Sequence, residues 1–235
     1  LKNDLASFQG WAIDLARNGL DGFYERPGFH DYTPGYLYVL WVVGIVGSWL
    51  GGIGDLIKIP PILADVALGW LVWSMARELG AGRRAALVGA GLVVANPVSW
   101  FDSVLWGQVD SFGVVFLLLG VRELWRDRPE RAAILTVVAA LIKPQLGILI
   151  PLVAAVTIRR ALWPTGEADA PSPADDEAAS PAPLARFRAW ERGTDRPVRI
   201  LTTGAAGFLT AVALCFPFGL SVIGPGQNGA LLESG

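Results

Sequence analysis

Polar side chains stand where an apolar stretch begins, in "WFDSVLWGQVDSFGVVFLLLG" over residues 100–120. They are Asp102, Gln108 and Asp110, and from Val114 onward the stretch is compatible with lipid. A charged side chain at the centre of a bilayer helix costs about 2.5–3.5 kcal/mol on insertion scales, so such residues usually line a pathway or a binding site. The pattern therefore predicts that these side chains form the wall of a polar pocket.

A lysine interrupts a second apolar stretch, "AALIKPQLGILI" over 139–150. Pro144 lacks an amide hydrogen and biases Lys143 away from helical conformation, which predicts two short helices that meet at Lys143, Pro144 and Gln145. A lysine at such a break can pair with an anionic ligand, above all a phosphate. The alternative is a lysine that extends to the membrane surface. Because Asp102, Gln108 and Asp110 supply further polar groups on the same side, we favour the binding role for Lys143.

Two further carboxylates precede these motifs. Asp31, in "FHDYTPGYLYVLW", lies on a turn bounded by proline and glycine, whereas Asp4, in "KNDLASFQGWAIDLA", starts an amphipathic helix and has the helix N-cap as its simpler role. Asp65, in "ILADVALGW", lies within an apolar run, which favours a hydrogen bond between packed helices. One histidine and one cysteine exclude a histidine-based metal cluster and a disulfide framework.

The composition indicates which elements position these residues. Hydrophobic residues make up 53% of the 235 residues and charged residues 17%, which is typical of an integral membrane protein. Apolar runs predict six membrane-spanning helices, at about 60–76, 84–98, 109–122, 132–143, 146–158 and 200–216. Most are shorter than the ~20 residues of a full crossing, so we expect polar extensions, tilt or packing around a cavity. The predicted fold is an all-α, polytopic transmembrane helical bundle.

The arginines orient the bundle. Fourteen of the 19 basic residues fall in three alternate loops, at 77–84, 122–131 and 159–199, which predicts that these loops are cytoplasmic. The polar stretches at 1–35, 100–110 and 142–145 then share the extracytoplasmic side. A crossing by the apolar run 36–50 would reverse this order, so we expect that run to form an interfacial helix along the outer surface.

These features divide the chain into four segments. Residues 1–58 are expected to form the first extracytoplasmic loop with interfacial helices, and residues 59–163 the transmembrane helices of one module. Residues 164–198, rich in proline, alanine and aspartate, are predicted to be a disordered cytoplasmic loop. Residues 199–235 are expected to add a transmembrane helix and the start of an outer loop. The first and last residues suggest a fragment of a longer protein.

The order of the motifs resembles that of a known superfamily. "ND…F..WA..LA", "DYTPGYLY", "PPILADV.LGWLVW", "SWFDSVLWGQVDSFGVVFLLLG" and "AALIKPQ" follow one another over most of residues 1–158. This arrangement is similar to that of the GT-C membrane glycosyltransferases. It looks closest to bacterial relatives of the GPI mannosyltransferase II group and of the lipid-phosphate-glucose-dependent glucosyltransferases of N-glycan assembly.

The resemblance implies an activity and its partners. The expected donor is a polyprenyl-phosphate sugar, and the expected reaction is inverting transfer of a hexose, mannose or glucose, to a hydroxyl on a lipid- or glycan-linked acceptor. The active site would be extracytoplasmic, in a multi-pass protein of the bacterial plasma membrane. No nucleic acid and no cofactor are expected, and the need for a divalent metal stays open.

The resemblance also implies roles for individual residues. Asp31 occupies the position of the general base, and Asp4 matches the early acidic residue of the first outer loop. Lys143, beside Gln145, would stabilise the leaving phosphate. The residues expected to bind or stack on the sugar are Asp102, Trp106, Gln108 and Asp110.

Two other functions fit parts of the pattern. A secondary transporter also builds its site from broken helices and buried acids, but it places that site at mid-membrane and often carries an inverted repeat. Here the polar groups gather at one face and no such repeat is visible. A membrane assembly subunit would leave that gathering of polar groups unexplained.

Overall fold

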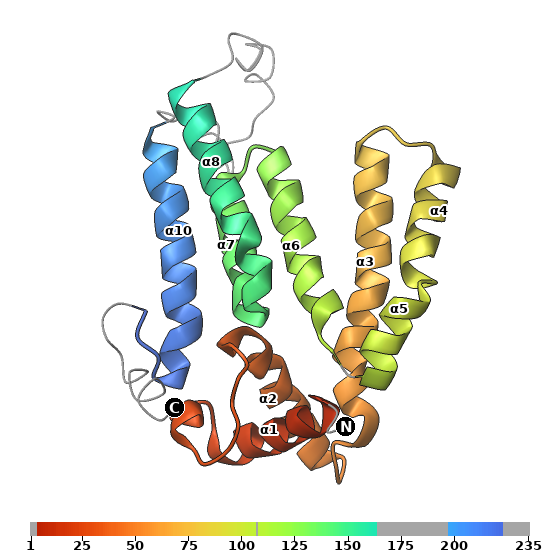
Figure 1. Cartoon of the computed structure of the whole chain (residues 1–235), viewed down its shortest axis with the longest axis vertical. Coiled ribbons are helices and arrows are strands. Elements are labelled where there is room, and N and C mark those ends of the chain that lie inside the picture. Colours follow the sequence, from red (N-terminus) through yellow and green to blue (C-terminus); the bar gives the residue numbers. More distant parts are fainter. Residues whose placement is uncertain (1–3, 107, 164–196, 223–235) are drawn as a thin grey trace, which may run out of the picture.

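The fold is a bundle of helices. The computed structural model describes residues 4–106, 108–163 and 197–222, and no strand occurs in these ranges (Figure 1). Six of the described helices run side by side: α3 (Ile59–Glu78), α4 (Arg83–Val94), α6 (Asp110–Trp125), α7 (Pro129–Ile142), α8 (Leu149–Leu162) and α10 (Val198–Cys215). This confirms the predicted all-α transmembrane bundle.

The helices pack in a defined order. Helix α3 contacts α4 and α6, α6 packs on α7, and α7 also contacts α8 and α10. Among the described residues, four helical segments are long and apolar enough to cross a membrane: Gly54–Glu78, Arg83–Ser103, Pro144–Leu162 and Val198–Phe218. Many of their large apolar side chains are exposed, as expected where a helix faces lipid rather than protein.

Helices α6 and α7, with 16 and 14 residues, are shorter than each of these four segments. Their length is limited by polar residues, because α6 begins at Asp110 and α7 ends just before Lys143. They pack closely at Gly120, where an added Cβ would lie 2.9 Å from the hydroxyl oxygen of Thr136. The two short helices therefore bring Asp110 and Lys143 to the same end of the bundle.

The chain breaks at Lys143, as predicted. Lys143 is extended, with φ −145° and ψ 119°, and the 3₁₀ helix η4 (Pro144–Ile148) follows it. Helix α8 then returns alongside α7 (Figure 1). A corresponding irregularity follows α4, where α5 (Pro97–Trp100) leads into the π-helical segment η3 (Phe101–Trp106).

Two helices lie across one end of the bundle. They are α1 (Asp4–Asn18) and α2 (Pro34–Trp49), which are connected through η1 (Phe23–Glu25), and η2 (Gly54–Lys58) leads on to α3 (Figure 1). Helix α2 is apolar but has only 16 residues, and it lies below the ends of α6 and α7, as expected for the run 36–50. This layer holds the best-buried aromatic core, which includes Phe8, Phe23 and Tyr36.

Glycine makes the contact between α1 and α2 possible. A Cβ on Gly44 would lie 2.0 Å from the carbonyl oxygen of Ala12, so any other residue there would force the helices apart. Gly35 is equally constrained, because its Cβ would lie 2.5 Å from the carbonyl oxygen of Leu141 on α7. The N-terminal layer is therefore held at a fixed distance from the break at Lys143.

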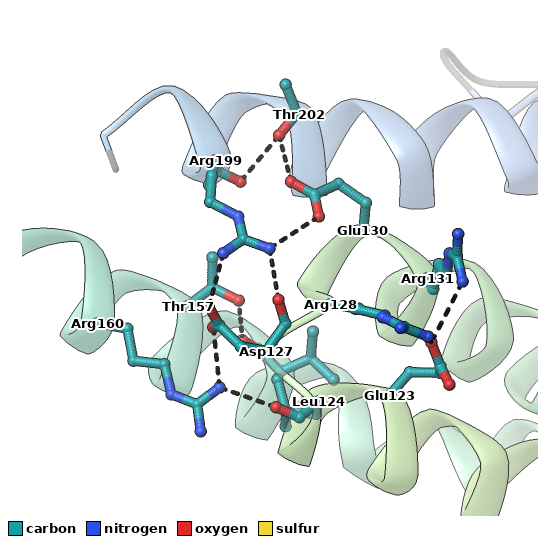
Figure 2. A network of polar contacts seen from close by, with 11 residues as sticks. Glu123, Leu124, Asp127, Arg128, Glu130, Arg131, Thr157, Arg160, Arg199 and Thr202 are labelled. Atoms are coloured by element: carbon teal, nitrogen blue, oxygen red, sulfur yellow. Dashed lines mark hydrogen bonds and ion pairs between the residues drawn. The ribbon is translucent and has the colours of Figure 1, made fainter. Parts of the chain in front are cut away.

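The turn between α3 and α4 and the turn between α6 and α7 lie at the opposite end of the bundle (Figure 1). Figure 2 shows Asp127, at the turn between α6 and α7, as an acceptor for Arg160 of α8 at 3.2 Å and for Arg199 of α10 at 2.9 Å. Asp127 adopts a left-handed conformation, with φ 56°. Exposed ion pairs contribute little individually, but these join three helices. The predicted loop 164–198 lies almost wholly outside the described residues.

The side of the membrane is a testable prediction. A cysteine at the exposed position Gln145, in a background without Cys215, is expected to react with a membrane-impermeant thiol reagent on intact cells. A cysteine at Leu79, which is 67% exposed in the turn between α3 and α4, should react only after permeabilisation. Labelling of Leu79→Cys from outside would show that the orientation is reversed.

Candidate active site

Lys143 occupies the centre of a polar cluster where α7 ends. Its Nζ donates to the side-chain oxygen of Gln108 at 2.9 Å and forms an ion pair with Asp110, which opens α6. The lysine side chain is 14% exposed and that of Asp110 is 42% exposed, so the pair lies at the edge of the packed interior. The extended backbone at Lys143 turns the chain away from α7 here and frees its side chain for these contacts.

Gln108 links segments that are far apart in the sequence. Its amide oxygen accepts from Lys143 and, at 3.5 Å, from the hydroxyl of Tyr32, while its amide nitrogen donates to the carboxylate of Asp4. Asp4 is 104 residues away in the chain. One amide therefore holds α1, the turn before α2 and the break after α7 together. The side chain of Asp4 thus binds a residue far away in the sequence, in addition to the helix-capping role that its position suggests.

Four carboxylates surround Tyr32. Burial raises the pKa of its phenol, and the negative charges of Asp4, Asp110, Asp31 and Asp102 raise it further. Tyr32 is therefore protonated at neutral pH and donates its hydrogen bond to Gln108. Its own backbone carbonyl accepts from the hydroxyl of Tyr24 at 2.8 Å, which holds the turn in place.

Asp31 is the exposed member of this group. It directly precedes Tyr32, and no hydrogen bond or ion pair joins its carboxylate to another residue in the described part of the chain. The backbone beside it is held on both sides, since Trp11 donates to the carbonyl of Phe29 at 2.9 Å and Pro34 begins α2. Asp31 is thus an exposed carboxylate on a fixed turn, without a partner among the described residues.

The other predicted site residues lie nearby but differ in their contacts. Asp102, in η3, lies close enough to Asp110 and Lys143 for their charges to act on it. Gln145 is exposed in η4, two residues beyond Lys143, and has no hydrogen bond to a described residue. Trp106 ends η3, and its side chain lies outside the described part of the structure.

The charges of this cluster limit its chemistry. The carboxylates Asp4, Asp31, Asp102 and Asp110 outnumber the one ammonium of Lys143, so the local field stabilises a centre that develops positive charge. An unpaired carboxylate can accept a proton, and the lysine offers N–H donors to an anion. In the described ranges, no three histidine, cysteine, aspartate or glutamate side chains are grouped to hold a metal ion.

Comparison with known proteins decides the family. The model of glycosyltransferase family 87 matches residues 29–165, which is more than half of the chain. The chain belongs to glycosyltransferase family 87. Searches of curated proteins and of solved structures gave no match.

The family 87 match covers most of the cluster. Asp31, Tyr32, Gln108, Asp110 and Lys143 lie within the matched range, whereas Asp4 lies before it. This family is of the GT-C type, so the match confirms a membrane glycosyltransferase and disfavours the transporter. It gives no support to the finer likeness to GPI mannosyltransferase II or to the N-glycan glucosyltransferases.

In this family 87 protein, the structure confirms the role predicted for Asp65 and adds Tyr32 to the site. Asp65 is buried in α3 and accepts from the hydroxyl of Ser111 on α6, which confirms the predicted hydrogen bond between packed helices. Tyr32 was missed, although it lies inside the motif "DYTPGYLY". Its signal was its place directly after Asp31 on the same turn, but aromatic residues are common in such turns beside a core.

Proposed function

We propose that this family 87 glycosyltransferase moves a hexose, mannose or glucose, from a polyprenyl-phosphate sugar to a hydroxyl on a lipid- or glycan-linked acceptor. The reaction takes place at the end of the bundle covered by α1 and α2, which faces outward from a bacterial plasma membrane. The observation that carries this proposal is the exposed carboxylate of Asp31, which pairs with no described residue, beside the described polar cluster in which Lys143 is the cation.

The reaction is a direct displacement. Asp31 accepts the proton of the acceptor hydroxyl, the acceptor oxygen forms a bond to the anomeric carbon, and the bond from that carbon to the phosphate oxygen breaks. The electron pair leaves with the polyprenyl phosphate. One displacement inverts the configuration at the anomeric carbon. Asp4 is the alternative base, but its carboxylate accepts from Gln108 in this structure.

The charges support the two halves of this reaction. Glycosyl transfer passes through a transition state with positive charge on the sugar, and the excess of carboxylates around Tyr32 stabilises such charge. The leaving phosphate gains negative charge, and Lys143 is the cation that neutralises it. Because Lys143 pairs with the half-exposed Asp110, donor binding exchanges one anionic partner for another.

The remaining polar residues bind the donor sugar in this proposal. Asp102, Gln108 and Asp110 hydrogen-bond its hydroxyls, and Gln145, exposed beside Lys143, contacts the donor at the phosphate side. Trp106 stacks on the sugar ring. Lys143 and Gln108 thereby place the anomeric carbon between the phosphate and the base.

A transfer assay tests the proposal. The enzyme is supplied with radiolabelled polyprenyl-phosphate mannose or glucose and a membrane lipid extract as acceptor source. We expect label in a new product with one of these donors and none with the corresponding nucleotide sugar. Transfer from the nucleotide sugar alone would contradict the donor class, and uptake of label into vesicles without covalent transfer would favour a transporter.

A further inference from the structure

A second site lies between α7, α8 and α10. These helices enclose an apolar cavity of about 440 Å³. Small residues create the space, among them Ala133, Ala154, Gly204 and Ala211. A Cβ added to Gly204 would meet no atom within 4 Å, so the cavity is open at that position. Along α8 its walls run from Ile150 to Ile158, a length of about 12 Å.

One end of this cavity lies beneath arginines. Ile158 lines it and is followed directly by Arg159 and Arg160, while Ile200 lines it and directly follows Arg199. Arg160 and Arg199 bind Asp127 (Figure 2). Arg159 is exposed and forms no ion pair with another residue in the described ranges. Positive charge therefore borders one end of the apolar cavity.

This basic end is remote from the candidate active site. Arg160 and Arg199 pair with Asp127 at the α6–α7 turn, where α7 begins, whereas Lys143 directly follows the last residue of α7. A donor whose phosphate lies at Lys143 cannot place that same phosphate at Arg159. The cavity is therefore a separate site. Its apolar walls and the neighbouring arginine fit a ligand with an apolar chain and an anionic end.

We propose that this groove binds an anionic phospholipid, with one acyl chain between α8 and α10 and the phosphate of the headgroup at Arg159. An apolar cavity that faces the bilayer fits the hydrocarbon chain of a lipid. Anionic lipids concentrate in the leaflet where arginine-rich loops lie. The lipid covers the small-residue faces of α8 and α10 and so steadies helices that the structure leaves mostly exposed.

Photo-crosslinking tests the acyl-chain site. The protein is placed in phosphatidylcholine vesicles that contain a trace of phosphatidylglycerol with a diazirine on its acyl chain, and crosslinked peptides are mapped. We expect labelling of α8 and α10 at the cavity. Gly204→Phe fills the groove and should lower labelling more than tenfold, because each displaced methylene is worth about fourfold in affinity. Ala154→Leu is a milder variant that should lower it several-fold.

Gly91→Phe is the matched control, because a Cβ at Gly91 also meets no atom within 4 Å but lies on α4, away from the cavity. Its labelling at α8 and α10 should equal that of the unaltered protein. Undiminished labelling of both Gly204→Phe and Ala154→Leu would overturn the proposed site. So would crosslinks spread evenly over the outer helix faces.

A second measurement tests the headgroup. Arg159→Gln should lower labelling by phosphatidylglycerol about fivefold, since one basic residue at the surface contributes about that factor, and should leave labelling by a phosphatidylcholine probe unchanged. Arg84→Gln, at the same end on α4, is the control and should change neither. Equal labelling by the two lipids in the unaltered protein would overturn the anionic headgroup.

Discussion

Replacement of Asp31 by asparagine is expected to lower the rate of sugar transfer by about 10²–10⁴, the usual cost of removing a general base. Asparagine keeps the shape of aspartate but accepts no proton at working pH. Asp31 is exposed and unpaired with any described residue, so the substitution should leave folding intact. The rate is measured with radiolabelled donor, and donor binding is measured separately to show that the site survives.

Asp4→Asn is the comparison that separates the two candidate bases. An asparagine at position 4 keeps an oxygen that accepts from Gln108, so we expect a smaller loss of activity than for Asp31→Asn. An inactive Asp4→Asn beside an active Asp31→Asn would exchange the two roles. Full activity of both variants would contradict an aspartate base and would lead next to a transport assay.

Replacement of Lys143 by alanine is expected to lower kcat/KM for the donor by about 10²–10³, the effect typical of losing one group that stabilises developing negative charge. A loss that appears mainly in the donor KM would indicate that Lys143 binds the phosphate equally in ground and transition states. Lys143→Arg keeps the charge and should retain part of the activity. Lys58→Ala, which removes a lysine paired with the exposed Asp55, is the matched control.

The loss in Lys143→Ala has a structural alternative. The substitution leaves Asp110 and Gln108 without the donor that joins them, so the unpaired carboxylate of Asp110 is a second source of lost activity besides the missing cation. The double variant Lys143→Ala with Asp110→Asn, compared with Asp110→Asn alone, separates the two causes. Its continued inactivity supports the phosphate role, whereas its recovery would assign Lys143 a role in holding Asp110. An unchanged donor KM and rate in Lys143→Ala would show that Lys143 does not bind the donor phosphate.

The helices and their breaks followed from local pattern. In lipid, the backbone N–H and C=O groups of an apolar run find no water and must hydrogen-bond to each other within a helix. All six predicted runs are accordingly helical, and the run 36–50 forms α2. The proline after Lys143 removes an amide hydrogen, which is why the break was predictable. Because a charged side chain is costly in the centre of a bilayer, the polar motifs were predicted to lie at helix ends. These are properties of short segments, and the sequence alone determined them.

The contacts within the cluster depended on the tertiary structure. The sequence predicted that Asp4, Asp102, Gln108, Asp110 and Lys143 share one end, but it did not show that Gln108 joins Asp4 to Lys143 or that Lys143 pairs with Asp110. It also left Tyr32 unnoticed among four carboxylates, and it left the cavity beside α10 unseen. Such contacts depend on how closely helices approach, and glycines such as Gly35 and Gly44 set that distance only once their packing partners are in place. Residues 104 positions apart meet because three helices converge, and no local pattern in the chain encodes that convergence.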